Sequence, residues 1–427
     1  MDENKQALVP KLRFPEYREA EGWKYIPLNR LAIRAKQKNR DQKIDRVLTN
    51  SAEFGVVDQR DFFDKDIATQ GKLEGYFVAE RGTYVYNPRI SSTAPVGPIS
   101  KNKIGTGVMS PLYTVFKFKD DRNDFYEHFF KTTGWHTYMR QASSTGARHD
   151  RMAISSDDFM AMPLPVSSQH EQQKIADCLS SLDEMIAAQG RKVSALKIHK
   201  KGLMQQLFPR KGETQPRLRF PEFHNADEWE SVPLGRLLVR SPDYGVNAPA
   251  APFSDLLPKY LRITDISEDG QYLSEKMVSV DMKPTAVNYL DEGDIVLART
   301  GASVGKSYRY RKEDGRLVFA GFLIRVKPAQ DKLLPAYLVN FLTTDVYWGW
   351  VAITSTRSGQ PGINSTEYSS LPIPLPQGDL SEQRRIADCL TSLDILISAH
   401  MQKLEFLKTH KEGLMQQLFP PMEVVEA

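Results

Sequence analysis

The sequence has little of the material that builds metal centres, disulfide frameworks or membrane spans. Its 427 residues include two cysteines and eight histidines, and neither a Cys-x-x-Cys nor a His-Glu-x-x-His spacing occurs. Two cysteines are too few for a disulfide framework, and structural zinc needs about four clustered ligands. No apolar run of about 18 residues is present, and the polar N-terminal segment lacks a signal-peptide core. We therefore expect a soluble cytoplasmic protein without a metal ion.

The charge of the chain is nearly balanced. Its 57 lysines and arginines against 53 aspartates and glutamates leave a formal net charge of +4. This balance is compatible with nucleic acid, because a DNA-binding protein needs positive charge only on one face. Hydrophobic residues make up 41% of the chain, so real cores can form, and the length suits two to four domains.

Two segments of the chain occur twice. Residues 10–34 and 216–240 are identical at 13 of 25 aligned positions. Residues 171–209 and 382–420 are identical at 25 of 39 positions, and both copies contain IADCL and end in GLMQQLFP. Internal repeats of this kind indicate a structure built from two similar halves.

The segments between the repeats, residues 35–160 and 241–371, share little sequence. Two similar frame segments therefore carry two different domains. This predicts a pseudo-two-fold molecule that presents two unlike recognition domains. A duplicated enzyme would more naturally keep its site residues alike in both copies.

Both copies of the longer repeat carry a heptad pattern that is typical of a coiled coil, sustained for more than four heptads. Polar residues interrupt it at matching positions, Gln189 with His400 and Lys200 with Lys411. Such residues can specify register at a cost in stability, or the two lysines can lie where the seam has already ended. The apolar seam residues are Ile175, Leu179, Leu182, Ile186, Val193, Leu196, Leu203 and Leu207, and Ile386, Leu390, Leu393, Ile397, Leu404, Leu407, Leu414 and Leu418.

Each heptad segment is expected to form one long helix that ends at a proline, Pro209 or Pro420. Each helix would span about 38 residues, or roughly 57 Å. Cys178 and Cys389 occupy equivalent positions beside the two seams. We expect small side chains at a helix contact there and no disulfide, because the cytoplasm is reducing.

Both variable segments combine short strand patterns with helix patterns, which predicts α+β domains. In the first, we expect strands within residues 75–88 and 107–118 and a helix near Asp124–Met139. In the second, strands and hairpins are expected within residues 260–267, 293–301, 307–315 and 317–328, and a helix over 333–351.

Basic, hydroxyl and amide side chains cluster in the turns of both domains. Arginine and lysine suit phosphates and guanine, and asparagine and glutamine suit adenine. Each residue taken alone could be an ordinary solvated loop residue, but the set on a two-part frame favours DNA contact. The candidates are Asn87, Arg89, Ser91, Ser92, Lys101, Lys103, Arg148 and Arg151 in the first domain, and Arg299, Thr300, Ser303, Lys306, Tyr308, Arg309, Arg357, Gln360 and Asn364 in the second.

Three short motifs imitate catalytic or nucleotide sites. TGASVGKS at residues 300–307 has three residues between its glycines where a phosphate-binding loop has four, and a strand pattern follows it. NPRI at residues 87–90 lacks the second proline and the aromatic of an amino-methyltransferase motif. Asp64 and Asp66 lack the partner pattern of a nuclease. We expect no catalytic residue in this chain.

The sequence resembles the specificity subunit of type I restriction–modification systems over nearly its whole length. The motifs are LPVSSQHEQQKIADCLSSLD and IPLPQGDLSEQRRIADCLTSLD, each followed by a helix that ends in GLMQQLFP, together with GYFVAERGTYVYNPRISS and GDIVLARTGASVGK. The resemblance implies two target-recognition domains, each reading half of a split DNA target. It also implies two central helices that pack antiparallel and set the spacing between the half-targets. It gives no base contacts to transfer, because recognition domains vary with the target.

The resemblance further implies partners that carry the chemistry. Two modification subunits, with S-adenosylmethionine and the adenine-methylating site, would dock on the frame. Restriction subunits, which use ATP and magnesium, would complete the nuclease, and this chain would bind no cofactor itself. Two other classes stay open at this point: a stand-alone DNA methyltransferase, and a coiled-coil adaptor without a role on DNA.

Heptad spacing by itself allows a parallel or an antiparallel pair of helices. The halves of a duplex target are related by an approximate dyad, and a frame with a matching dyad has antiparallel helices. The expected order is a first recognition domain at residues 1–165, a spacer helix at 166–209, a second recognition domain at 210–376, a second spacer helix at 377–420 and a tail at 421–427.

Because the frame is duplicated and the domains are not, each domain is expected to read DNA independently. Replacing residues 35–160 with the matching segment of another family member should change one half of the DNA target and leave the other half unchanged. Mapping methylated sites in cells that carry the hybrid measures both halves at once. A simultaneous change in both halves would contradict two independent domains.

Overall fold

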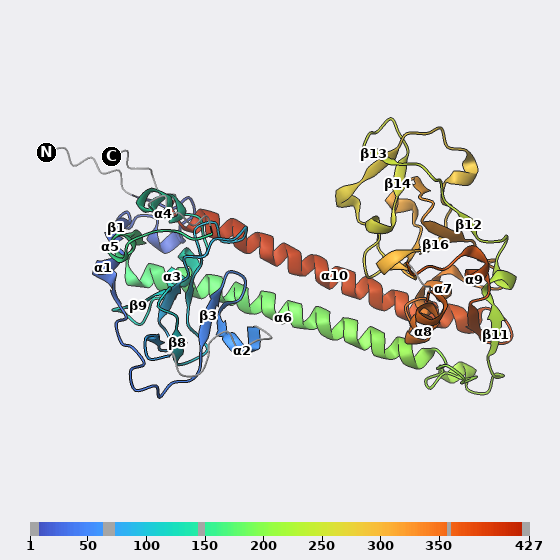
Figure 1. Ribbon diagram of the computed structural model, residues 1–427, viewed down its shortest axis with the longest axis horizontal. Coiled ribbons are helices and arrows are strands. Elements are labelled where there is room, and N and C mark those ends of the chain that lie inside the picture. Colours follow the sequence, from blue (N-terminus) through green and yellow to red (C-terminus); the bar gives the residue numbers. More distant parts are fainter. Residues whose placement is uncertain (1–7, 63–72, 144–149, 357–359, 421–427) are drawn as a thin grey trace. The chain divides into compact units, whose positions relative to one another are not determined.

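The structure is a computed structural model that describes residues 8–62, 73–143, 150–356 and 360–420. The chain folds into two compact units (Figure 1). Unit 1 holds the residues up to Gln189 and from Lys403 onward, and unit 2 holds Gly190–Gln402. The division runs through both long helices, whereas the expected boundaries kept the helices apart from the domains. Within the described residues, no helix has the length and apolar character needed to cross a membrane.

Both expected long helices are present, α6 at Gln169–Leu207 and α10 at Ser381–Leu418. Each ends two residues before a proline, which has no backbone N–H to continue the helix. All seam positions of both helices are buried or half-buried, the polar ones included. Cys178 and Cys389 are half-buried and form no disulfide, and burial raises the pKa of the Cys178 thiol.

In unit 1, the first half of α6 packs against the last turns of α10. Ile175 and Leu179 share a hydrophobic core with Met415 and Leu418. Further along α6, the Asp183 carboxylate accepts a hydrogen bond of 2.5 Å from the Nζ of Lys411. Since rising numbers on one helix meet falling numbers on the other, the two helix halves of this unit run antiparallel.

Unit 2 contains the matching contact between the other two helix halves. Lys200 Nζ donates to both carboxylate oxygens of Asp394, at 2.6 and 2.7 Å. Asp183 and Asp394 occupy equivalent positions in the sequence repeat, as do Lys200 and Lys411. Each lysine therefore pairs with an aspartate of the facing helix, and the alternative that the seam ends before the lysines is wrong. Burial lowers the pKa of Lys411.

The variable part of unit 1 is built on a four-stranded sheet in the order β2-β9-β6-β7, with two smaller strand pairs, β3-β4 and β5-β8. The strands are β2 (Ala32–Arg34), β3 (Leu48–Ser51), β4 (Gly55–Asp58), β5 (Phe77–Ala79), β6 (Tyr84–Tyr86), β7 (Ile99–Lys101), β8 (Gly107–Met109) and β9 (Thr114–Phe118). The short helices are α1 (Leu28–Leu31), α2 (Gln59–Phe62), α3 (Asp124–Phe129), α4 (His136–Ala142) and α5 (Ser156–Met160).

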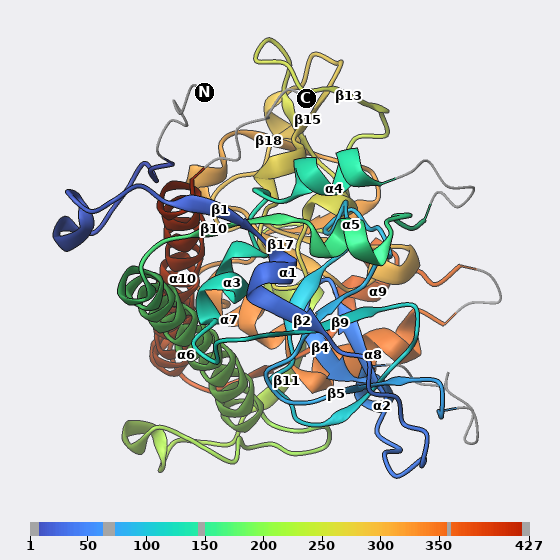
Figure 2. The same cartoon turned by 90° about the vertical axis from the view of Figure 1, so that its left-hand side faces the viewer.

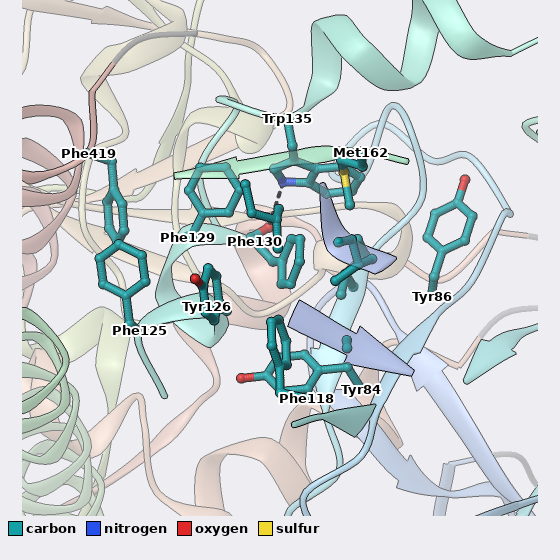
Figure 3. Packing of buried hydrophobic residues seen from close by; sticks show 14 of the residues in the cluster. Tyr84, Tyr86, Phe118, Phe125, Tyr126, Phe129, Phe130, Trp135, Met162 and Phe419 are labelled. Atoms are coloured by element: carbon teal, nitrogen blue, oxygen red, sulfur yellow. Dashed lines mark hydrogen bonds between the residues drawn. The ribbon is translucent and has the colours of Figure 1, made fainter. Parts of the chain in front are cut away.

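Alternation along β6 and β9 supplies the core of unit 1. Tyr84 and Phe116 point into an aromatic cluster with the helices, whereas Val85 and Val115 belong to a second cluster on the other face. The aromatic cluster reaches the end of α10, where the Phe419 ring lies 5.1 Å from the ring of Phe125, centroid to centroid (Figure 3). This contact joins the end of α10 to the variable part of unit 1.

Unit 2 carries two four-stranded sheets, in the orders β12-β19-β16-β17 and β13-β15-β14-β18. The second sheet contains one parallel pair, β14 with β18. The strands are β12 (Asp243–Tyr244), β13 (Ala250–Pro252), β14 (Lys259–Leu261), β15 (Val278–Val280), β16 (Ile295–Ala298), β17 (Ser307–Arg309), β18 (Leu317–Phe319) and β19 (Leu323–Val326). The short helices are α7 (Pro335–Phe341), α8 (Asp345–Thr354) and α9 (Ser365–Ser369).

The strand predictions were correct in place, but two helix predictions were wrong in length. The helix expected over Asp124–Met139 is interrupted between α3 and α4, where Gly134 lies and the Thr132 hydroxyl donates back to the Phe129 carbonyl. The helix expected over residues 333–351 is divided at Thr344, whose hydroxyl accepts a hydrogen bond from the Tyr347 N–H and so begins α8. Hydroxyl side chains that bond nearby backbone groups compete with a continuing helix.

A buried ion pair joins the N-terminal repeat to the start of each long helix. In unit 1, Arg13 Nε and Nη2 donate to the two carboxylate oxygens of Glu171 at 2.7 and 2.8 Å. The same guanidinium donates to the carbonyls of Ala20 and Glu21, both at 2.9 Å. Arg13 is 8% exposed and Glu171 is 1% exposed. We call this arrangement the Arg–Glu clamp.

Unit 2 repeats the clamp with Arg219 and Glu382, at 2.8 Å for both hydrogen bonds. Arg219 likewise donates to the carbonyls of Ala226 and Asp227. The tryptophans differ, because Trp23 Nε1 donates to Glu171 whereas the buried Trp229 Nε1 has no partner among the described residues.

Two-stranded ribbons close each domain beside its clamp. In unit 1, β1 (Lys24–Pro27) pairs antiparallel with β10 (Pro163–Val166), and Figure 2 shows the two strands side by side. In unit 2, β11 (Glu230–Pro233) pairs with β20 (Pro372–Leu375) in the matching register. Each variable domain therefore enters and leaves the frame through neighbouring strands.

The N-terminal repeat also contacts the end of a long helix. The Leu12 N–H donates to the Gln417 carbonyl at 2.9 Å within unit 1. The Leu218 N–H donates to the Gln206 carbonyl at the same distance within unit 2. The two units thus repeat the same connection between helix end and following segment.

Breaking one clamp should destabilise one unit. Glu171→Ala leaves the Arg13 charge buried without its partner, and we expect a loss of about 3–5 kcal/mol in unfolding free energy. The double variant Arg13→Met/Glu171→Leu should lose less, because no charge is then left buried. Urea denaturation followed by tryptophan fluorescence measures both. Equal losses in the single and double variants would show that packing, and not the unpaired charge, sets the cost.

Candidate nucleic-acid interface

A cavity of about 260 Å³ in unit 1 gathers four of the predicted contact residues. We call it the Arg89/Arg151 cleft. Arginine, asparagine and hydroxyl side chains dominate its polar lining, and no carboxylate is among the described residues that line it. The predicted residues in it are Asn87, Arg89, Ser91 and Arg151, and the other lining residues are Thr49, Asn50, Ser51, Ala52, Pro88, Ile90, Pro98, Leu112 and Tyr113.

An isolated antiparallel bridge places Arg89 opposite Arg151. On its two sides, the Ile90 N–H donates to the Asp150 carbonyl and the Met152 N–H donates to the Pro88 carbonyl, both at 2.9 Å. These bonds flank the arginine pair, so Arg89 and Arg151 form the non-hydrogen-bonded kind of pair, in which the side chains lie closest. Two arginines 62 residues apart are thus held side by side.

Two asparagines hold the base of the cleft in place. The Asn50 side-chain amide donates to the carbonyls of Val85 and Pro98 at 2.7 and 3.1 Å. The Asn87 side chain donates to the Asn50 carbonyl at 2.9 Å and accepts a hydrogen bond from the Arg89 N–H at 3.0 Å. Asn87 therefore positions the backbone that carries Arg89.

Sequence reasoning missed the part of the cleft that β3 supplies, Thr49, Asn50 and Ser51. Thr49 shares a hydrogen bond of 3.0 Å with the Tyr113 hydroxyl, which also lines the cleft. The only available signal was a run of polar residues at the end of a strand pattern, which is common in solvated turns.

The remaining predicted residues of unit 1 lie outside the cleft. Lys101 pairs with Asp124 at 2.7 Å and Lys103 pairs with Glu127 at 2.7 Å, so α3 carboxylates already occupy both ammonium groups. Ser92 is exposed in the turn after Ser91. Arg148, and likewise Asp64 and Asp66, lie outside the described residues.

In unit 2, two loops that carry predicted residues lie side by side. Thr300 forms an antiparallel bridge with Gly362, the Gly301 N–H donates to the Pro361 carbonyl at 3.0 Å, and the Ile363 N–H donates to the Arg299 carbonyl at 2.9 Å. We call this the 299/364 loop pair. It brings together Arg299, Thr300, Ser303, Gln360 and Asn364.

The Arg299 guanidinium of the loop pair stacks on a tyrosine ring. Its guanidinium carbon lies 4.7 Å from the centre of the Tyr244 ring, and Tyr244 is 42% exposed. The Tyr244 hydroxyl in turn accepts a hydrogen bond from the Ser365 N–H at 3.1 Å. A planar guanidinium that stacks on an aromatic ring loses less freedom when it binds a base or phosphate.

Two predicted residues of unit 2, Asn364 and Lys306, bond other parts of the protein. Asn364 caps α9, because its side chain accepts a hydrogen bond from the Glu367 N–H at 2.9 Å. Lys306 pairs with Glu268. Gly301–Ser303 is a single 3-10 turn followed by strand β17, and not the loop-to-helix element that binds nucleotide phosphates.

The prediction for Tyr308 was wrong. Tyr308 is 1% exposed, lies in the core of unit 2 and donates a hydrogen bond of 2.6 Å to Asp314, so it cannot contact DNA. Arg309, the next residue of β17, faces the opposite side of the sheet and is half-buried, and burial lowers its pKa. Arg357 lies outside the described residues.

Unit 2 also has a larger cavity, of about 1040 Å³, at the start of α10. No predicted contact residue lines it. It has no preference for a polyanion, because its cationic and acidic side chains balance. The charged lining residues are Arg236, Lys332, Arg384 and Arg385, and Glu230, Asp331, Asp379 and Asp388.

Comparisons with known proteins point to one family. Residues 259–409 match the family model of the type I restriction modification DNA specificity domain. The type I restriction enzyme MjaVIII specificity subunit of Methanocaldococcus jannaschii is 25% identical over 336 residues, which cover 75% of this chain and 74% of that protein. The putative MjaX specificity subunit of the same organism is 31% identical over 130 residues, or 30% of each chain.

Solved structures resemble the fold. An S subunit of a type I restriction-modification system from M. genitalium superposes with a TM-score of 0.58 at 13% identity, over 97% of this chain and all of that chain. A chain from a study of complex assembly and conformational transition of the type I R-M system gives a TM-score of 0.55 at 16% identity, over 93% of this chain and 98% of that chain.

Arg299 and Tyr308 provide a matched pair of variants. Arg299→Ala should weaken binding to the target duplex by about 1–3 kcal/mol, because a positioned guanidinium is lost. Tyr308→Phe should leave affinity within about two-fold, because the side chain faces the core. Anisotropy titration of labelled duplex with the assembled complex measures both. A stronger effect of Tyr308→Phe in a folded protein would overturn this assignment of the surface.

Proposed function

We propose that this chain is a specificity subunit of a type I restriction–modification system and reads a bipartite DNA target with one recognition domain in each unit. The observation that carries the proposal is the contrast between frame and surface. Both units repeat the Arg–Glu clamp, the closing ribbon and the Lys–Asp pair across the helices. Their candidate contact surfaces differ in residues, elements and shape, as expected of two domains that read different half-sequences.

Unit 1 offers a concave cationic cleft, and unit 2 offers the 299/364 loop pair with a stacked arginine. Arginine can satisfy phosphate oxygens or the guanine edge through its planar set of donors. Glutamine, as Gln360, suits the adenine edge. Both surfaces thus have arginines that suit DNA, but they differ in shape and in the groups beside those arginines, and this difference supports two distinct half-targets.

The helices α6 and α10 are proposed to form one antiparallel coiled coil with a pseudo-two-fold axis, and to set the spacing between the half-targets. Support comes from the heptad pattern and from the cross-helix ion pair in each unit. In unit 1, α6 supplies the aspartate and α10 the lysine, whereas in unit 2, α6 supplies the lysine and α10 the aspartate. A parallel pairing would bring different residues opposite these charges, so polar seam residues favour one orientation.

Catalysis is proposed to reside in partner subunits. Two modification subunits with S-adenosylmethionine would dock on the duplicated helices and methylate adenine, and restriction subunits would add ATP- and magnesium-dependent cleavage. The duplicated frame supports two docking positions, because each half presents the same residues. In this arrangement the present chain supplies sequence recognition and geometry alone.

The proposal that a partner subunit supplies catalysis can be tested by measuring methyl transfer with and without that subunit. The purified chain should bind its target but transfer no methyl group, and addition of the modification subunit should give adenine methylation at one bipartite sequence. Tritiated methyl transfer to duplex DNA measures both steps. The chain mixed with a modification subunit and a duplex of scrambled half-sequences is the control. Methyl transfer by the chain alone would refute the proposal.

Helix length should set the spacer between the half-targets. Four residues inserted after Ala188 in α6 and four after the equivalent Ala399 in α10 lengthen each helix by about 6 Å, a little under two base pairs. Matched insertions keep both Lys–Asp pairs, whereas an insertion in α6 alone shifts one helix against the other. We expect unchanged half-sequences with a spacer longer by one or two base pairs.

The readout is the methylated motif found by sequencing genomic DNA of cells that carry the variant. Four residues slightly exceed one helical turn and rotate the seam by only about 40°, so the packing can adapt. An unchanged spacer in an active variant would show that the helices do not set the spacing. Altered half-sequences would show that reading and spacing are not separable.

A further inference from the structure

The Arg89/Arg151 cleft brings two like charges together, with Arg89 exposed and Arg151 half-buried. Arg89 and Arg151 are directly opposite each other in a non-hydrogen-bonded antiparallel pair. Like charges at such positions are destabilising, and the side chains are closer there than at a hydrogen-bonded pair. Proteins usually place a carboxylate between such groups.

Little of that repulsion is offset within the described residues. Arg151 lies 3.8 Å from the carboxylate of Asp150, its neighbour in sequence, and no ion pair of Arg89 occurs among the described residues. None of the described residues that line the cleft is acidic. Hydroxyl and amide groups, among them those of Ser91 and Asn87, complete the polar lining. This set of groups is complementary to an anion.

We propose that the cleft binds one phosphate of the DNA backbone between Arg89 and Arg151. The inference rests on the proposed function, because it names the part of the DNA that this surface contacts. The phosphates project from the surface of the duplex, whereas base edges are recessed in its grooves, so a phosphate is the part of paired DNA that a cleft reaches most readily. The cleft therefore positions unit 1 on the DNA and carries no sequence information itself.

The bound phosphate neutralises the arginine pair, so the free protein stores a repulsion that DNA relieves. Asn87 holds the backbone of Arg89 in place, because its side chain accepts a hydrogen bond from the Arg89 N–H and donates to the Asn50 carbonyl. Two guanidinium groups carried by paired strands can take two oxygens of one phosphate in the fork geometry that arginine favours.

The salt dependence of DNA binding tests the phosphate site in the Arg89/Arg151 cleft. In the assembled complex, Arg89→Gln/Arg151→Gln should reduce the slope of log K against log salt by about 1, the loss of one phosphate contact. Affinity should fall about ten-fold for the target duplex and for a scrambled duplex alike, since charge-assisted hydrogen bonds are lost. The methylated sequence should not change. Arg122→Gln removes an exposed arginine of unit 1 outside the cleft and serves as the matched control.

Three outcomes are decisive. A slope equal to that of the wild type would overturn the phosphate site. A changed methylated base with an unchanged slope would make these arginines base readers instead. A wild-type complex that binds no bipartite duplex in preference to a scrambled one would refute the proposed function, whatever the variants do.

Thermal unfolding of the full chain without DNA provides a second, independent readout. At low salt, Arg151→Gln should raise the melting temperature of unit 1, because it removes the repulsion. Inorganic phosphate should raise the melting temperature of the wild type more than that of Arg151→Gln. A lower melting temperature for Arg151→Gln, with an equal response to phosphate, would show that the pair is not under repulsion and would overturn the proposal.

Discussion

The buried Arg–Glu clamp is the interaction on which the rest of each unit depends. Glu171 lies in the first turn of α6, where the positive end of the helix dipole also favours a carboxylate. Arg13 uses its fork to join that carboxylate to the carbonyls of Ala20 and Glu21 in the N-terminal repeat. All three guanidinium nitrogens of Arg13 and both carboxylate oxygens of Glu171 thereby gain a partner, which is the condition under which a buried charge is tolerated.

The clamp makes the frame independent of the domain that it carries. Its residues, and the ribbon beside it, belong to the frame or its margins, so changes on a distant recognition surface do not touch them. The two surfaces have indeed diverged in kind: paired strands bring two arginines together in unit 1, and in unit 2 an arginine stacks on a tyrosine.

The long helices could be predicted from the sequence because heptad spacing is local and is repeated many times. The breaks at Gly134 and Thr344 could not, since one glycine or threonine is tolerated within many helices. Strand positions were also local, but partners such as β5 with β8 or β14 with β18 depend on contacts far apart in sequence. The same limit applied to Arg13 and Glu171, which are identical in both repeats yet 158 residues apart.

The candidate site shows the limits of reading composition. Residue type predicts DNA contacts at Arg89, Arg151 and Arg299, and these stay predictions, whereas Tyr308 was taken for a contact although its side chain faces the core. Asn50 escaped notice because its role follows from the carbonyls of Val85 and Pro98, which only the fold brings near it.

The contact between helix end and following segment has a topological consequence. In unit 2, the Leu218 N–H bonds the Gln206 carbonyl within one continuous stretch of chain, whereas in unit 1 the equivalent Leu12 and Gln417 are bonded although most of the sequence separates them. A peptide that joined residue 420 to residue 8 would therefore stand where the connection between α6 and β11 stands in the other unit. With that added peptide the backbone would form a closed ring, and a circularly permuted chain that starts in the connection between α6 and β11 would keep the contacts within both units. The order of the two domains along the sequence then depends only on where in this ring the chain termini lie.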